Sequence, residues 1–386
     1  MHSLHQVLKI NVLKGKIMKK IFILVATIFA LSICALAQNT LVGAVLITRH
    51  GDRTPFGNIQ NFNYNWGSAP AELTPIGMNQ AYTLGTTLRT DLVTNEKLLS
   101  PTYPANSIVA GASATNRTFD TAECVLMGLY PPGTGPKLAN GKPALPNAFQ
   151  PIPITTLPVS DFTILTQYPQ YTALLQQYVY NSPAWIALQA QYQPYFAKWQ
   201  QVLGNPVNSL SDVLAVGDML IVAKAHNLTM PKGLSTQDIN NIINATNTGL
   251  AIQFQTLNVS YPMGSQLLND IMGNLNAFAT NTSQGAKLYY YSGHDITILP
   301  IMSLLGSPLS SDPGYAANVL IKLYKNDSNQ YFVEVDYNGK PVSLPVMNGG
   351  TLASLPLLQN YVNGVNAKFA PTTSGSSTVS GSSTTK

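Results

Sequence analysis

Two apolar runs in the chain are each followed at once by charged and polar residues. The first extends from Leu41 to Ile47 and is rich in branched side chains, and the second extends from Leu288 to Ser292. Short apolar runs bounded by polar residues indicate strands buried on both faces, as in a parallel or mixed sheet. Residues 106–110 have the same character, so we expect a further strand there.

A hairpin is predicted later in the chain. Residues 319–324 and 331–337 alternate between apolar and polar side chains and flank Asn326–Asn329, a sequence typical of a turn. The pair Asn338-Gly339 predicts a second tight turn, because both residue types tolerate a positive φ.

Helix signals lie between the predicted strands. Thr74 can cap a helix that has Pro75 in its first position and runs to about Leu88. A second helix is expected over residues 117–130, because a Pro-Pro-Gly sequence follows it, and an apolar third helix over residues 296–305.

The segment between residues 140 and 280 has a different pattern. Large side chains recur there at helical spacings, which predicts helices that pack on one another rather than a cage for a ligand. The last of these helices is expected from Met263 to Phe278. The recurring residues are Tyr168, Tyr171, Leu174, Leu175, Tyr178, Trp185, Leu188, Tyr192, Tyr195, Phe196 and Trp199.

These patterns predict an α/β protein with a mixed, mostly parallel sheet, flanking helices and an inserted, mainly α cap domain. We detect no internal repeat. The expected division is a leader at 1–37, a first part of the α/β core at 38–139, the α-rich cap insertion at 140–284, a second part of the core at 285–370 and a disordered Ser/Thr/Gly tail at 371–386.

The leader has the order of a secretory signal peptide. Met18-Lys19-Lys20 is basic, Ile21 to Leu36 is apolar, and Ala35-Leu36-Ala37 supplies a small-x-small cleavage site before Gln38. The apolar run is shorter than the roughly 20 residues of a membrane span. We therefore expect a periplasmic or secreted protein without stable membrane insertion once the leader is cleaved. Met18 is an alternative start to Met1.

Removing the leader makes the chain electrically neutral. Five of the 21 basic residues and none of the 16 acidic residues lie in 1–37, so sixteen of each remain. Nucleic-acid binding needs a basic face, which this balance does not provide. Cys124 is the one cysteine after the leader, so we expect no intramolecular disulfide and an inert thiol.

The candidate chemistry lies directly after the two apolar runs. Beyond the leader the chain has only three His and four Arg, and most of them fall at strand ends, where open α/β sheets bind ligands. The candidates are Arg49, His50 and Arg53 after the first run, Arg117 at a helix start, and His294 and Asp295 after the later run.

Phosphoryl transfer accounts for each of these residue types. Arginine offers a planar set of donors that matches phosphate oxygens and stabilises charge in the transition state. The imidazole of His50 can attack phosphorus and hold it covalently, which divides one difficult step into two. The leaving alcohol then needs a proton, and Asp295 can supply it. Because Asp295 donates only when it is protonated, we expect an acidic pH optimum.

Each candidate also has a purely structural interpretation. Arg117 could pair with Asp120 at helical spacing, and His294-Asp295 could simply cap a helix. We expect a structural or substrate-rim role for His226 and a surface position for Arg89. A catalytic metal is disfavoured, because the chain has no His-x-His, no His-Glu-x-x-His and no Cys pair, and arginines would repel a cation.

The motifs resemble those of the histidine acid phosphatases, a branch of the histidine phosphatase superfamily. The sequence Arg-His-Gly-Asp-Arg-Thr-Pro at 49–55 is similar to the first family signature, and His294-Asp295 is similar to the second. Four shorter segments also resemble the family: Asn116-Arg117-Thr118, Gly-Leu-Tyr-Pro-Pro at 128–132, Leu-Thr-Pro at 73–75 and Leu-Thr-Met-Pro at 228–231. The resemblance therefore covers residues 42 to about 345.

The resemblance implies a role for each residue. His50 would be the phosphorylated nucleophile and Asp295 the proton donor. Arg49, Arg53, Arg117 and His294 would form the phosphate pocket. The family fold is an α/β core with a mainly α cap, and no cofactor is implied. The implied partners are small-molecule phosphate monoesters.

The sequence departs from the family at several points. It cannot form the disulfides of many eukaryotic members, Gly111-Ala112-Ser113-Ala114 replaces an Arg-Ser-Thr-Asp sequence, and Lys322 stands where an acid is expected. These differences leave the reaction intact but leave the substrate preference open.

Three competing functions remain at this point. A phytase would belong to the same family, although Ile296-Thr297 differs from the Thr-Asn that often follows His-Asp in phytases. A phosphoglycerate mutase shares the Arg-His-Gly sequence but is shorter and has no such leader. A non-catalytic exported protein that binds phosphate esters would keep the pocket and not the chemistry. The substrate and the oligomeric state stay open.

Overall fold

The computed structural model describes residues 39–62, 64–67, 69–157 and 170–369. The chain forms two compact units, the larger made of Leu41–Tyr324 and Tyr331–Lys386 and the smaller of Met1–Thr40 and Lys325–Gln330. The expected leader and the expected tail lie outside the described residues. Within the described part of the chain, no helix combines the length and the apolar character needed to cross a membrane.

The smaller unit contains the predicted hairpin turn. The side-chain oxygen of Asn326 accepts hydrogen bonds from the backbone N–H groups of Ser328 and Gln330, at 3.0 and 2.8 Å. These bonds close the turn between the two strands that the alternating pattern predicted, so the prediction over 326–329 is confirmed.

The larger unit contains a mixed sheet with a parallel centre. Its strand order is β3-β2-β4-β1-β5-β6-β7, and β8 pairs with β6. β1 and β2 run parallel to β4, and β3 runs parallel to β2, whereas β7 and β8 are antiparallel to β6. The strands are β1 (Thr40–Arg49), β2 (Ile108–Ala112), β3 (Ile154–Thr156), β4 (Leu288–Gly293), β5 (Asn318–Lys325), β6 (Tyr331–Tyr337), β7 (Lys340–Pro341) and β8 (Leu352–Ser354).

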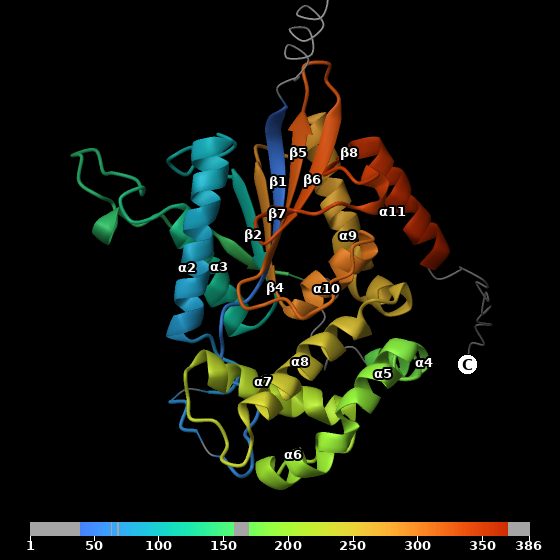
Figure 1. Cartoon of the computed structure of the whole chain (residues 1–386). Helices are drawn as coiled ribbons and strands as arrows, with labels where there is room; N and C mark the ends of the chain where they lie inside the picture. The colour runs from blue at the N-terminus through green and yellow to red at the C-terminus, as the bar shows by residue number, and fades with distance from the viewer. Residues whose placement is uncertain (1–38, 63, 68, 158–169, 370–386) are drawn as a thin grey trace, which may run out of the picture. The chain divides into compact units, whose positions relative to one another are not determined.

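Helices cover both faces of this sheet. In Figure 1, α2 (Pro75–Arg89) and α3 (Asn116–Leu129) lie on one side, and α9 (Leu257–Thr280) and α11 (Leu355–Phe369) lie on the other. Alternate side chains of β1 enter two different cores. Ala44 and Leu46 belong to the core cluster that includes α2 and α3, and Val45 and Ile47 belong to the cluster that includes α9, α10 (Asp295–Leu304) and α11. Because both faces are buried, the run is apolar throughout.

A third core lies among α4 (Tyr171–Tyr178), α5 (Pro183–Tyr192), α6 (Phe196–Leu203), α7 (Leu210–Ala225) and α8 (Thr236–Gln253). We call these five helices the cap helices. Trp185, Tyr192 and Trp199 are buried in this core, so the prediction of helix packing is confirmed for them. Tyr178 and Tyr195 are instead exposed, at 37% and 41%, and Tyr168 lies outside the described residues.

Most predicted boundaries agree with the structure. Thr74 caps α2 by accepting a hydrogen bond from the N–H of Gly77, and α3 and α10 begin and end within one residue of the expectation. Asn338 and Gly339 have φ values of 49° and 71° and connect β6 to β7, which confirms the second tight turn.

Two boundaries differ from the prediction. β2 begins at Ile108 because Asn106 has a φ of 66° and belongs to a turn, so the strand predicted over 106–110 lies two residues later. α9 begins at Leu257 and not at Met263. Pro262 disfavours helical residues before it, but Val259 and Ser260 are fully buried, and this packing outweighs the local preference.

Three residues singled out in the sequence lie away from the strand ends. Lys322 is buried and pairs with Glu334 and Asp336, each at 2.8 Å, so its charge is compensated inside the sheet. Arg89 is half-buried rather than on the surface, because it donates to the carbonyl of Leu129 at the end of α3. Cys124 is half-buried, and burial raises the pKa of its thiol to about 11, which keeps it protonated and unreactive.

Candidate active site

The register of the central strands assembles the candidate site. β1 and β4 are parallel, with Thr48 opposite Ser292 and Arg49 opposite Gly293. The next residues along the two strands, His50 and His294, therefore leave the sheet side by side, and their ring centroids are 5.5 Å apart. The site thus lies at the carboxyl ends of the parallel strands, as the sequence predicted.

The orientation of His50 identifies its free nitrogen. Its Nδ1 lies 2.8 Å from the carbonyl oxygen of Gly51. Because a carbonyl only accepts, Nδ1 carries the proton and Nε2 keeps its lone pair. Position 51 must be glycine, since a Cβ there would lie 2.3 Å from the backbone oxygen of Gly77 at the start of α2.

The imidazole of His50 is held in its neutral form. The side chain is almost fully buried, with 2% exposed. Burial, followed by the neighbouring His294 and Arg49, lowers the pKa of His50 well below its ordinary value. An exposed histidine would take up a proton in mildly acidic solution, whereas His50 stays neutral and able to act as a nucleophile there.

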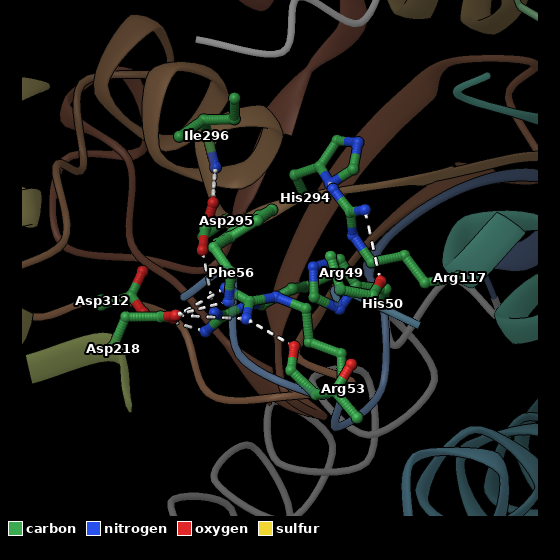
Figure 2. A network of polar contacts seen from close by, with 12 residues as sticks. Arg49, His50, Arg53, Phe56, Arg117, Asp218, His294, Asp295, Ile296 and Asp312 are labelled. Atoms are coloured by element: carbon green, nitrogen blue, oxygen red, sulfur yellow. Dashed lines mark hydrogen bonds and ion pairs between the residues drawn. The ribbon is translucent and has the colours of Figure 1, made fainter. Parts of the chain in front are cut away.

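Three arginines surround His50, as Figure 2 shows. Arg49 donates to Asp295 at 2.8 Å and to Asp312 at 2.9 Å, and Arg53 donates to Asp218 at 2.7 Å. The Nε atoms of Arg49, Arg53 and Arg117 are all buried, and none has a hydrogen-bond partner in the described part of the chain. Buried donors without partners are costly, so this arrangement favours an anionic ligand with several oxygens.

Arg117 belongs to this group rather than to a helical pair with Asp120. Its Nη2 lies 3.4 Å from Nδ1 of His294, and the ring of Phe56 lies 5.5 Å from its guanidinium carbon and 3.9 Å from that of Arg53. Burial and the charge of Arg53 lower the pKa of Arg117 to about 10, so the group stays charged in neutral and acidic solution.

His294 has two roles in the structure. Its backbone N–H donates to Thr297, which caps α10, as one interpretation of the sequence allowed. Its ring contacts Arg117 through Nδ1 and the hydroxyl of Ser113 through Nε2, at 2.8 Å. Because Arg117 can only donate, the ring proton lies on Nε2. Burial, with the charge of Arg117, lowers the pKa of His294 to about 3, so the ring is neutral.

Asp295 lies at the first position of α10, beside Arg49. One carboxylate oxygen accepts from the N–H of Ile296 at 2.7 Å, and the other accepts from Arg49 at 2.8 Å. Burial alone would raise the pKa of Asp295, but Arg49 and His294 outweigh it and lower the pKa below its ordinary value. The free protein therefore holds Asp295 as a carboxylate whose partner is Arg49.

Four further groups at the site were missed by the sequence analysis. Asp218 pairs with Arg53, Asp312 pairs with Arg49, Tyr315 places its ring 4.6 Å from the guanidinium carbon of Arg49, and Ser113 contacts His294. Asp218 could have been noticed as the acid in the apolar middle of α7, beyond Asp212 in the first turn. Ser113 lies in the segment 111–114 that departs from the family motif, but no role was assigned to it from the sequence. Asp312 and Tyr315 lie in a segment without periodicity or a motif, so no local signal marked them.

His226 connects the cap helices to the segment that carries His50. It ends α7, and its Nε2 donates to Asp52 at 2.6 Å. Asp52 is fully buried and also accepts from Thr74 at 2.5 Å. These contacts favour the structural role for His226 over the substrate rim. In the described part of the chain, no group of three or more His, Cys, Asp or Glu side chains could hold a metal ion.

Comparison with known proteins identifies a family and several relatives. The profile of the histidine phosphatase superfamily (branch 2) matches residues 40–338. The lysosomal acid phosphatase of Xenopus laevis is 30% identical over 343 residues, which cover 84% of this chain and 77% of the relative. The human lysosomal acid phosphatase is 29% identical over 324 residues, covering 78% and 72%.

Solved structures with a similar fold include phytases. The Klebsiella sp. ASR1 phytase matches with a TM-score of 0.65 and 16% identity, over 85% of this chain and 94% of that one. The Hafnia alvei phytase in complex with myo-inositol hexakis sulphate matches with a TM-score of 0.64 and 15% identity, over 86% and 98%. At these identities the likeness concerns the fold alone.

Proposed function

The chain belongs to the histidine phosphatase superfamily (branch 2), and from this membership we propose that His50 takes the phosphoryl group from a phosphate monoester in an acid phosphatase reaction. Its relatives include lysosomal, prostatic and testicular acid phosphatases. The observation that carries the assignment of residues is the set of three buried arginines around His50, each with an unpartnered Nε.

The first step forms a phosphohistidine. Nε2 of His50 attacks phosphorus in line with the departing oxygen, the nitrogen–phosphorus bond forms, and the bond to the alcohol oxygen breaks. Asp295 gives its proton to that oxygen, so the product leaves as a neutral alcohol. Arg49, Arg53 and Arg117 hold the equatorial oxygens, and His294 lines the same pocket.

The second step releases inorganic phosphate. Water attacks phosphorus and the bond to His50 breaks, which restores the neutral imidazole. Asp295, now a carboxylate, accepts a proton from the attacking water and returns to the acid form. The same carboxyl group thus serves in both steps, and the reaction needs no cofactor.

The three competing functions receive less support. Phytate carries six phosphates, and a phytase of this kind needs a strongly basic pocket, whereas the chain beyond the leader has equal numbers of acids and bases. A binding protein without activity needs no nucleophile and no proton donor. The structure has a free Nε2 on His50 and a carboxyl group, Asp295, bound to Arg49 beside it. A phosphoglycerate mutase needs no signal peptide, and residues 18–37 have the order of one.

We retain a periplasmic or secreted location as part of this proposal, supported by that leader sequence. The division into a core at 38–139 and 285–370 and a cap at 140–284 is likewise proposed, with the exception that β3 (Ile154–Thr156) pairs with β2 in the sheet of the core. The cap helices support it, because they share a hydrophobic core of their own. α9 and α10 each contribute to this core and to the core beneath the sheet, so both connect the two.

Release of inorganic phosphate from ethyl phosphate tests the proposed function. We expect turnover without added metal and a kcat/KM that falls as the pH rises from 4 to 8, because His50 stays neutral throughout while the small protonated fraction of Asp295 shrinks further. Phosphate binding without turnover would instead support the binding protein. Faster isomerisation of 3-phosphoglycerate than hydrolysis would support the mutase.

A further inference from the structure

A cleft of about 570 Å³ extends from the phosphate end of the site into the cap helices. Its inner end is lined by Arg49 and Arg53 together with the carboxylates that bind them. Its outer wall is formed mainly by apolar side chains, among them Leu175 from α4, Leu214 and Met219 from α7, Leu250 from α8 and Ile296 from α10. The cleft is therefore charged at one end and mainly apolar along the rest, where Ser211, Thr246 and Gln253 are polar members of the lining.

The charges in this cleft restrict the substrate to one phosphate group. Among the described residues that line it, Arg49 and Arg53 are the only cations, and both lie at the phosphate end. A second phosphate on the same molecule would face Asp218, Asp295 and Asp312 or the leucine wall. Desolvating that anion without a cationic partner is costly, so polyphosphorylated molecules bind poorly.

We propose that the substrates of this enzyme are phosphate monoesters of bulky apolar alcohols that carry a single phosphate group. The proposal rests on the phosphatase function above and specifies its substrate class. The arginines hold the phosphate, and the alcohol lies along the wall of Leu175, Leu214 and Leu250. A volume of about 570 Å³ accommodates an alkyl chain or an aromatic ring system, and burying it against apolar side chains provides the binding energy.

A series of n-alkyl phosphates from ethyl to octyl tests this proposal. The longer alcohols leave with nearly the same pKa, so changes in rate report binding rather than chemistry. We expect kcat/KM to rise about two- to fourfold for each added methylene until the cleft is filled. Benzyl phosphate is included to distinguish an aromatic from an alkyl alcohol, since either belongs to the proposed class.

Two variants of the wall make the test specific. Leu214→Gln and Leu250→Gln introduce polar groups into the cleft, so the dependence on chain length should become markedly shallower. The matched control is Leu357→Gln on α11, where the side chain is 44% exposed and outside the cleft, and it should keep the parent's dependence.

The outcomes separate this proposal from the phosphatase function itself. Equal kcat/KM for ethyl and octyl phosphate, or faster hydrolysis of phytate than of octyl phosphate, would overturn the substrate class and leave the phosphatase intact. Absence of phosphate release from every ester would overturn the phosphatase. The series on the parent protein decides the question even if a variant fails to fold.

The ion pair between Arg49 and Asp312 supports a second, independent inference. Nη1 of Arg49 donates to Asp312 and to the carbonyl of Pro313, while Nη2 donates to Asp295. Two carboxylates therefore hold the guanidinium that an incoming phosphate needs. The other oxygen of Asp312 is buried and has no hydrogen-bond partner in the described residues.

The surroundings of Asp312 favour its protonated form in acid. The charged and titratable groups near it are Arg49 on β1, Asp295 on α10, Asp218 on α7 and Tyr337 on β6. Burial raises the pKa of Asp312 to about 7, with Arg49 opposing and Asp295 adding to this rise. Asp312 is thus neutral below that pH and a carboxylate above it, whereas Asp295 is already ionised.

We infer that Asp312 is a positioning residue that controls how freely Arg49 can bind the phosphate group. When protonated, Asp312 releases most of its hold on Arg49 and removes a negative charge beside the phosphate. When ionised, it competes with the substrate for the same guanidinium and repels it. Affinity for anions should therefore fall as the pH rises through neutrality, independently of the proton on Asp295.

Sulfate inhibition between pH 6 and 8 tests this inference, because sulfate keeps the same charge across the range. In the parent we expect the inhibition constant to rise about tenfold. In Asp312→Asn the rise of the inhibition constant between pH 6 and 8 should be absent. An equal rise in both proteins would show that Asp312 has only a structural role.

Discussion

Replacing His50 with alanine should abolish turnover while leaving anion binding in place. We expect kcat to fall by at least about 10⁴-fold, because alanine removes the nitrogen that is proposed to attack phosphorus. The three arginines remain, so sulfate should still raise the melting temperature of the variant. This combination distinguishes loss of the nucleophile from loss of the fold.

The direct measurement is rapid-quench labelling with a ³²P-labelled monoester. The parent should retain acid-labile, base-stable phosphate on the protein, and His50→Ala should retain none. A matched control is His226→Gln, in which the amide can still donate to Asp52 and the label should persist. Turnover within about tenfold of the parent in His50→Ala would place the nucleophile on another residue.

Replacing Asp295 with asparagine should slow the first step only for esters whose alcohol needs a proton. For ethyl phosphate we expect formation of the phosphohistidine to slow by about 10²- to 10³-fold. For p-nitrophenyl phosphate, whose product leaves readily as an anion, the same step should slow by less than about tenfold. Asparagine keeps the shape of Asp295 and its amide oxygen can still accept from Arg49, while the proton that the alcohol needs is removed together with the acceptor for the N–H of Ile296.

Single-turnover kinetics with both esters, measured from pH 4 to 8, provide the readout. In the parent, the rate with ethyl phosphate should fall with rising pH, because Arg49 keeps the pKa of Asp295 low and the acid form is lost early. In Asp295→Asn this dependence should disappear. Equal losses for both esters would mean that Asp295 only positions Arg49.

Contacts along the chain explain why much of this protein could be predicted from its sequence. The uninterrupted apolar run over 41–47 predicted a strand buried on both faces. In the structure, neighbouring side chains of this strand, Ala44 and Val45, do enter different cores. Thr74 and Pro75 start α2 through a local hydrogen bond. The residues proposed for phosphate binding could be named because the motif at 49–55 and His294-Asp295 each follow such a strand directly.

Contacts between distant segments were decided only by the tertiary structure. Arg49 and Asp312 are separated by 263 positions, and Arg53 and Asp218 by 165, so no local spacing relates them. The sheet register brings His50 and His294 to one edge, and the cap helices then bring Asp218 and the apolar wall to the same place. Periodicity reports which side of an element is buried, but not which element buries it. The sequence therefore determined the reaction class and named the residues proposed for it, whereas the carboxylates that hold the arginines and the surface proposed to receive the alcohol depend on the folded chain.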